Sequence, residues 1–116
     1  MEKSYNERLK KLINQYVHKV YDYSVNFPKN EVFGLTSQLK RSAMSVALNY
    51  VEGYARRRKL VFKNFIEISY GSLKESVYLV EFSYNRKYLN INQYKELNNL
   101  AEEVAKMLWG IMDKLD

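Results

Sequence analysis

Four long stretches of this sequence carry apolar residues at steps of three and four, the spacing that places side chains on one face of an α-helix. The 116 residues include one proline and four glycines, so few positions interrupt these stretches. That scarcity favours a few long helices over many short strands. Eleven tyrosines would suit strands, but the helical periodicity is the stronger signal. The sequence predicts an all-α fold with helices over about 4–26, 33–57, 59–88 and 91–115.

Polar residues and one proline mark the ends of several predicted helices. The segment Ser4–Glu7 has the pattern of a capping box at the start of the first helix. Pro28 should end that helix, and Asn90 or Asn92 should cap the fourth. The connections are short, so consecutive helices should be antiparallel neighbours. We therefore predict one domain over residues 1–116, an antiparallel up-down-up-down four-helix bundle.

The third helix is predicted to carry two apolar stripes, about 100° apart, where a surface helix needs only one. The stripes are Phe62, Ile66, Ser69, Leu73, Val77, Val80 and Tyr84, and Val61, Phe65, Ile68, Ser72, Leu79 and Phe82. Gly71 and Ser72 lie in the middle of this helix, where glycine costs about 1 kcal/mol relative to alanine. We interpret this pair as a point of close contact between helices.

The positive charge of the chain is concentrated in its first half. Residues 1–58 hold 11 lysines and arginines against 5 acidic residues, whereas residues 59–116 hold 8 against 8. The formal net charge of +6 therefore belongs to the first half and its junction with the second. A basic surface attracts nucleic acid, anionic lipid or acidic protein, and does not by itself choose among them.

The strongest local feature is a run of cations where the second predicted helix meets the third. The candidate nucleic-acid-binding residues are Arg56, Arg57, Arg58, Lys59 and Lys63, with Lys40 and Arg41 in support. Guanidinium groups suit phosphate, which favours an anion-binding patch at the end of the bundle. The alternative is that the cations complement the dipole of the preceding helix and keep the protein in solution. Tyr54 is close enough to stack on a base, although a structural tyrosine is the simpler interpretation.

Residues that carry catalysis or bind metals are scarce. The absence of cysteine excludes disulfides, thiol nucleophiles and zinc–thiolate sites. The single histidine, His18, follows Gln15 by three residues, so the Glu-x-x-His pairs of a di-iron bundle are missing. Glu52 should pair with an arginine of the same chain or of a neighbour. There is no Gly-rich phosphate loop and no nucleophile elbow, so we expect no enzyme, cofactor, metal or small-molecule substrate.

The sequence gives no sign of a membrane span or signal peptide. The longest stretch without a charge, Ser42 to Val51, is about half of the ~20 residues needed to span a bilayer. The chain reaches Leu12 without an apolar signal region. We therefore expect a cytoplasmic protein without a membrane partner.

Several motifs together resemble the four-helix-bundle family of bacterial 23S rRNA intervening-sequence proteins. They are Phe27-Pro28-Lys29, Gly34 to Ala43, Asn49 with Glu52-Gly53, Arg56-Arg57, Phe62 with Phe65, and Gly71 to Glu75. The resemblance extends to about Leu89 and implies an antiparallel bundle assembled as a ring, a homopentamer. A similar bundle is an accessory protein of diversity-generating retroelements, with nucleic-acid binding by a basic ring as its proposed role. The sequence differs from the family where Ala47 replaces a frequent proline and Arg58 replaces a common serine.

Two functional hypotheses follow. The first is a non-enzymatic, oligomeric module that binds RNA or DNA, structured RNA above all, through the basic patch. Nothing in the sequence is suited to reading base edges, so this binding should follow shape and charge. The second is an oligomeric protein-interaction scaffold without nucleic-acid binding. In it, the extra apolar stripe of the third helix and exposed tyrosines mediate assembly.

Overall fold

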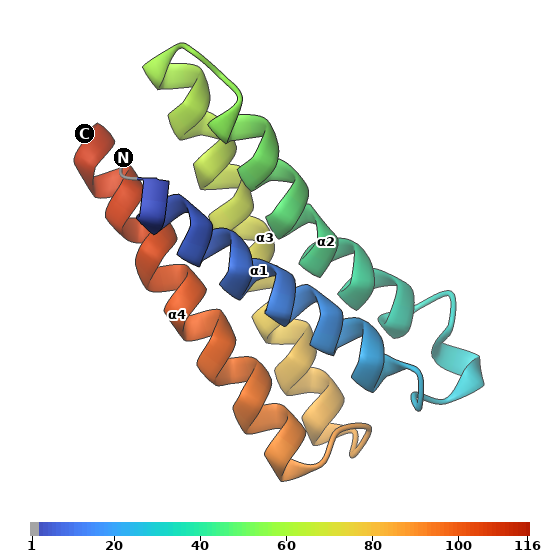
Figure 1. The fold of residues 1–116 in the computed structure, drawn as a ribbon. Coiled ribbons are helices and arrows are strands. Elements are labelled where there is room, and N and C mark those ends of the chain that lie inside the picture. The colour runs from blue at the N-terminus through green and yellow to red at the C-terminus, as the bar shows by residue number, and fades with distance from the viewer. Residues whose placement is uncertain (1–2) are drawn as a thin grey trace.

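The computed structural model describes residues 3–116, which form four long helices and no strand. The helices are α1 (Lys3–Ser24), α2 (Leu35–Tyr54), α3 (Lys59–Asn85) and α4 (Ile91–Leu115), with a short 3-10 helix, η1 (Lys29–Glu31), between α1 and α2. Figure 1 shows the helices packed side by side, with both ends of the chain at the same end of the bundle. The helices that pack on each other are α1 and α2, α2 and α3, α3 and α4, and α4 and α1, so each long helix contacts two others. The all-α prediction is confirmed. None of the described helices has a stretch long and apolar enough to cross a membrane.

Four predicted boundaries extend too far into connections. The first helix ends at Ser24 and not at residue 26, and the second begins at Leu35 and not at residue 33. The helix predicted to reach residue 57 ends at Tyr54, because one intervening residue is too few to reverse the chain between antiparallel helices. The helix predicted to reach residue 88 ends at Asn85. Lys87 has a φ of 68°, and the amides of Lys87 and Tyr88 bond back to carbonyls of the last helical turn. This left-handed C-terminal motif stops the helix.

The predicted caps have opposite outcomes. Asn90 caps α4: its side chain accepts from the amide of Gln93 at 2.8 Å, and the Gln93 side chain accepts from the amide of Asn90 at 3.0 Å. The expected capping box at Ser4 is wrong, because Ser4 lies inside α1, which already includes Lys3. A capping residue has non-helical backbone angles, so the Ser4–Glu7 pattern is a chance match within a helix.

The core consists of the inward-facing apolar residues of all four helices, which in α3 are those of the first predicted stripe and Leu79 of the second. The most buried large side chains are Tyr16, Tyr50, Leu9, Ile13, Leu39, Ile66, Leu73, Leu97 and Leu108. Tyr16 donates or accepts a hydrogen bond of 2.8 Å with Ser76, which links α1 to α3 across the core. Ser69 of α3 donates to the carbonyl of Val46 in α2 at 2.7 Å. Each of these buried hydroxyl groups has a hydrogen-bond partner, which offsets the free-energy cost of removing it from water.

The close contact between α2 and α3 lies at Gly53 and not, as predicted, at Gly71. A Cβ atom at Gly53 would lie 2.8 Å from the Cβ of Phe65, which is closer than real contacts allow. A Cβ atom at Gly71 would meet nothing within 4 Å, and Gly71 is exposed. Its neighbour Ser72 does contact α2, through a 2.8 Å hydrogen bond between its Oγ and that of Ser45. One residue's rotation, about 100°, turns Gly71 away from this contact.

Gly53→Ala should lower the free energy of unfolding by about 1–2 kcal/mol. The added methyl group must displace Phe65, which outweighs the ~1 kcal/mol that alanine gains in a helix. Urea unfolding at matched protein concentration measures the change. Asn99→Ala, at an exposed position of α4, is the control and should leave stability unchanged or slightly higher. A Gly53→Ala protein as stable as the wild type would show that this contact is not tight.

Candidate nucleic-acid interface

Residues 55–58 connect α2 to α3 at the end of the bundle that also holds both ends of the chain (Figure 1). α2 closes with the Arg56 amide bonded to the carbonyl of Gly53 at 3.0 Å. Arg58 has extended backbone angles and directly precedes α3, and its carbonyl accepts from the amide of Phe62 at 2.9 Å. The fold therefore places three consecutive arginines on a turn that protrudes from one end of the bundle.

Two cations of this turn and the first residue of α3 are exposed, and within the described residues they have no acidic partner. Arg56 is occupied: its Nη2 donates to Oε2 of Glu52 at 2.7 Å, and its guanidinium lies 5.1 Å from the centre of the Phe65 ring. The expected partner of Glu52 is thus an arginine of the same chain. Within residues 3–116, Arg57, Arg58 and Lys59 make no ion pair. We call these three residues the cationic tip.

Lys63, one turn further along α3, contributes to structure. Its Nζ donates to a carboxylate oxygen of Asp116, which follows the last residue of α4. This hydrogen bond raises the pKa of Lys63 above its ordinary value. Lys63 therefore fastens the start of α3 to the end of α4 and is less available to a ligand than the cationic tip.

Lys40 and Arg41 do not join the cationic tip. They lie in the first two turns of α2, and about 20 Å of helix separates Arg41 from Tyr54 at the other end. The Lys40 ammonium lies 5.0 Å from the centre of the Tyr21 ring on α1. The predicted basic patch is thus two separate groups, because Lys40 and Arg41 belong to the far end of a long helix.

Tyr54 takes part in an aromatic cluster beneath the turn. Its ring stacks on Tyr50 at 6.1 Å between centroids and meets the Phe62 ring edge-on at 6.3 Å. Both neighbours belong to the packing between α2 and α3. This arrangement supports the structural role for Tyr54.

Arg58 stands at the N-cap of α3 without a capping hydrogen bond from its side chain. Arg58→Ser should therefore raise the free energy of unfolding by about 1 kcal/mol, since a serine oxygen can accept from an amide of the first turn. The same change removes one cation of the tip and should weaken binding to an RNA. Thermal unfolding and RNA titration of the variant measure the two effects. Loss of stability would contradict the capping argument.

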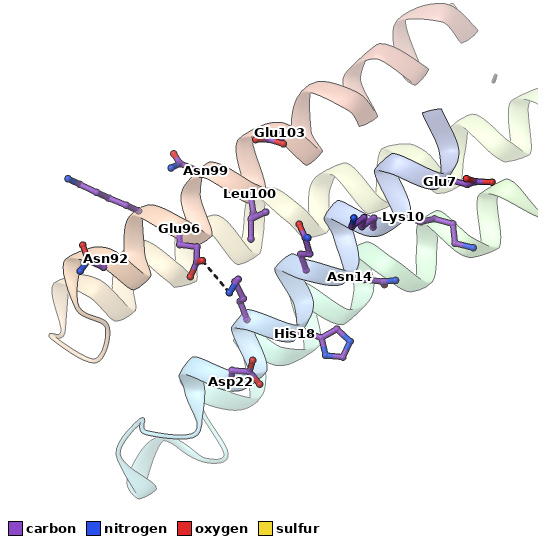
Figure 2. A pocket seen from close by; sticks show the side chains of 14 residues that line it. Glu7, Lys10, Asn14, His18, Asp22, Asn92, Glu96, Asn99, Leu100 and Glu103 are labelled. Atoms are coloured by element: carbon purple, nitrogen blue, oxygen red, sulfur yellow. Dashed lines mark ion pairs between the residues drawn. The ribbon is translucent and has the colours of Figure 1, made fainter. Parts of the chain in front are cut away.

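An open groove of about 1110 Å³ lies between α1 and α4 (Figure 2). Its lining holds four lysines and four acidic residues: Lys10, Lys11, Lys19, Lys95, Glu7, Asp22, Glu96 and Glu103. Glu96 pairs with Lys19 at 3.2 Å and accepts a hydrogen bond from Tyr23, which lowers the pKa of Glu96. Figure 2 shows the acidic side chains spread along the groove rather than gathered at one point. Balanced charges give this groove no preference for an anionic ligand.

The groove could not be predicted from the sequence, because it combines residues from opposite ends of the chain. His18 lines it at an exposed position. Among residues 3–116, no three histidine, aspartate or glutamate side chains come together as a metal site would require. The cationic tip, in contrast to this groove, holds three exposed charges of a single sign on consecutive residues.

The comparisons with known proteins agree with this fold. Residues 6–110 match the family described as 23S rRNA-intervening sequence protein. The chain belongs to this family. A crystal structure of a protein of unknown function, from the S23 ribosomal protein family of Bacteroides thetaiotaomicron VPI-5482, is similar with a TM-score of 0.85 and 22% identity. The similarity covers 94% of this chain and 98% of the other. The comparison with curated proteins gives no match.

The structure places the two positions at which the sequence differs from the family resemblance. Arg58 occupies the position where the family resemblance expects a serine, and the structure has no side-chain cap there. Ala47, at the position of the expected proline, lies in a continuous helix. Arg58 is therefore a third consecutive arginine at an N-cap position that has no side-chain cap.

Proposed function

We propose that this member of the family is a non-enzymatic, oligomeric protein that binds nucleic acid, structured RNA above all, through the cationic tip. The observation that supports the proposal is the exposure of Arg57, Arg58 and Lys59 on one turn without an acidic partner within residues 3–116. Like charges held together repel each other, and phosphate groups relieve that repulsion.

Binding by this tip follows charge and shape. The turn offers guanidinium and ammonium groups to phosphates, and a protruding turn of this kind does not place a helix or strand into a groove of the nucleic acid. We therefore expect little sequence preference. Backbone phosphates of RNA and DNA are both suitable ligands, and a folded RNA presents them at high density.

Self-association strengthens such binding. One tip offers about three phosphate contacts, which is weak at physiological salt. In a ring of five copies, the arrangement implied by the family resemblance, each contact raises the effective concentration of the next. The proposed assembly is therefore a homopentamer with its tips on one rim.

Filter binding tests the proposal, with a folded RNA and a DNA duplex as ligands at about 0.1 M salt and mass in solution measured on the same sample. The proposal predicts binding of both nucleic acids by an oligomer. A protein that binds neither the RNA nor the DNA would contradict the proposal. An oligomer that binds neither would favour the scaffold hypothesis.

A further inference from the structure

The side of α3 that faces away from the core carries an exposed apolar stripe. It runs along the helix at steps of three and four, through Leu60, Ile68, Gly71, Tyr78 and Phe82, with the polar residues Asn64 and Glu75 at the intervening positions. The four large apolar side chains among them are between 41% and 79% exposed. A helix that is apolar on its inner and outer faces is one that packs on both sides. Within residues 3–116, only the inner face has a partner.

Gly71 lies at the centre of this stripe, and no contact within residues 3–116 accounts for a glycine there. A Cβ atom there would meet no atom within 4 Å. Glycine weakens the interior of a helix relative to alanine. Glycine on an outward face allows another helix to approach closely. The position therefore suits a contact with a second molecule.

The apolar surface continues onto α2. Leu48 and Val51 of α2 are 58% and 55% exposed. Ser45 of α2 and Ser72 of α3 form a hydrogen bond. Because the two helices are antiparallel, Leu48 then lies at about the same height along the bundle as Ile68. The outer faces of α2 and α3 together measure about 700 Å² if each helix offers a strip ~10 Å wide. Standard protein interfaces bury about 600–1,000 Å² per partner, so this face lies within the range of a stable contact.

The charge of this face indicates which partner it fits. From Leu60 to Phe82, α3 carries two lysines and three glutamates, in a chain with a formal net charge of +6. Copies of a basic protein repel each other unless they meet through a face that is close to neutral. A nucleic acid, in contrast, is not attracted electrostatically to a neutral apolar face.

We infer that a second copy of this chain docks along the outer face of α3, with Gly71 at the point of closest approach. The inference rests on the self-association in the proposed function and names the surface that mediates it. The cationic tip, where the turn meets the start of α3, lies at one end of this contact and stays free for a nucleic acid.

Light scattering on Gly71→Arg and Ile68→Lys tests the inference. The wild type should have a mass that is a multiple of 13.9 kDa, and both variants should fall to 13.9 kDa at the same concentration. The open space at Gly71 means that Gly71→Arg should keep the helical circular dichroism of the wild type. Asn99→Arg, which adds the same charge to α4 away from this face, is the control and should keep the wild-type mass.

Variants that keep the wild-type mass would overturn the inference, as would a wild type that is monomeric at every concentration. Neither result depends on RNA binding, which is measured separately on the same samples. If the wild type does not bind RNA but Gly71→Arg converts the oligomer to monomers, the docking face is supported and only the nucleic-acid proposal is contradicted.

Discussion

Replacing Arg57, Arg58 and Lys59 together with glutamine should weaken binding to a folded RNA about 100-fold at moderate salt. Each exposed cation near a dense array of negative charge contributes on the order of 1 kcal/mol. The loss of three contacts therefore amounts to roughly 3 kcal/mol, or two factors of ten in the dissociation constant. Arg56 is left in place because it already pairs with Glu52.

The salt dependence of binding should change in the same variant. Each phosphate contact releases counterions, so the slope of log K against log salt should become shallower in the triple variant, by about 2 to 3 for each tip that contacts the RNA. Folding should be unaffected, because the three side chains are exposed and make no ion pair within residues 3–116.

A matched control removes three cations elsewhere. Lys10, Lys11 and Lys95 are exposed residues of the groove between α1 and α4. Their replacement with glutamine changes the net charge by the same amount as the tip variant. If binding depends on the tip, the control should retain most of its affinity. Equal losses in both variants would mean that RNA responds to the net charge alone.

The stability of the fold should fall as pH rises from about 10 to 12, with Tyr16 as a main cause. Burial raises the pKa of Tyr16 from 10.0 to about 12. In this interval the unfolded chain loses the phenol proton and the folded chain keeps it, so the free energy of unfolding decreases. Below pH 10 both states keep the proton and this contribution is constant. The expected loss from this residue is roughly 2–3 kcal/mol across the interval.

Tyr16→Phe isolates that contribution. The variant loses the hydrogen bond to Ser76, which still donates to the carbonyl of Leu73 at 2.8 Å, so it should be about 1 kcal/mol less stable at neutral pH. Its stability should then fall less steeply above pH 10 than that of the wild type. Val20→Ala, a buried change in the same helix, should shift the wild-type profile down in parallel. Urea unfolding at pH 8 to 12 gives all three profiles, and parallel profiles for Tyr16→Phe and wild type would contradict this account.

The helical architecture could be predicted from the sequence because the periodic apolar residues that define each helix are local. The predicted bounds of α4 match the observed Ile91–Leu115, where an Asn90 cap gives a clear start. The predictions failed at positions decided by contacts between helices. Gly53 and Gly71 are alike as glycines in apolar helices, and only the packing of α2 against Phe65 distinguishes their roles.

The site was predictable in part for the same reason. Arg57, Arg58 and Lys59 are adjacent in sequence, so any turn there brings them together. Their availability depends on partners that the sequence does not reveal, such as Asp116, which engages Lys63 from the opposite end of the chain. The separation of Lys40 and Arg41 from the tip follows from the length of α2, and a boundary placed within a few residues suffices to predict it.

Hydrogen–deuterium exchange with and without a folded RNA tests most directly whether the turn between α2 and α3 is the nucleic-acid contact. The account predicts that RNA slows exchange in peptides spanning residues 55–62 and leaves those of the groove between α1 and α4 unchanged. Protection of that groove, or of the η1 end of the bundle, with residues 55–62 unaffected while RNA is bound, would contradict it.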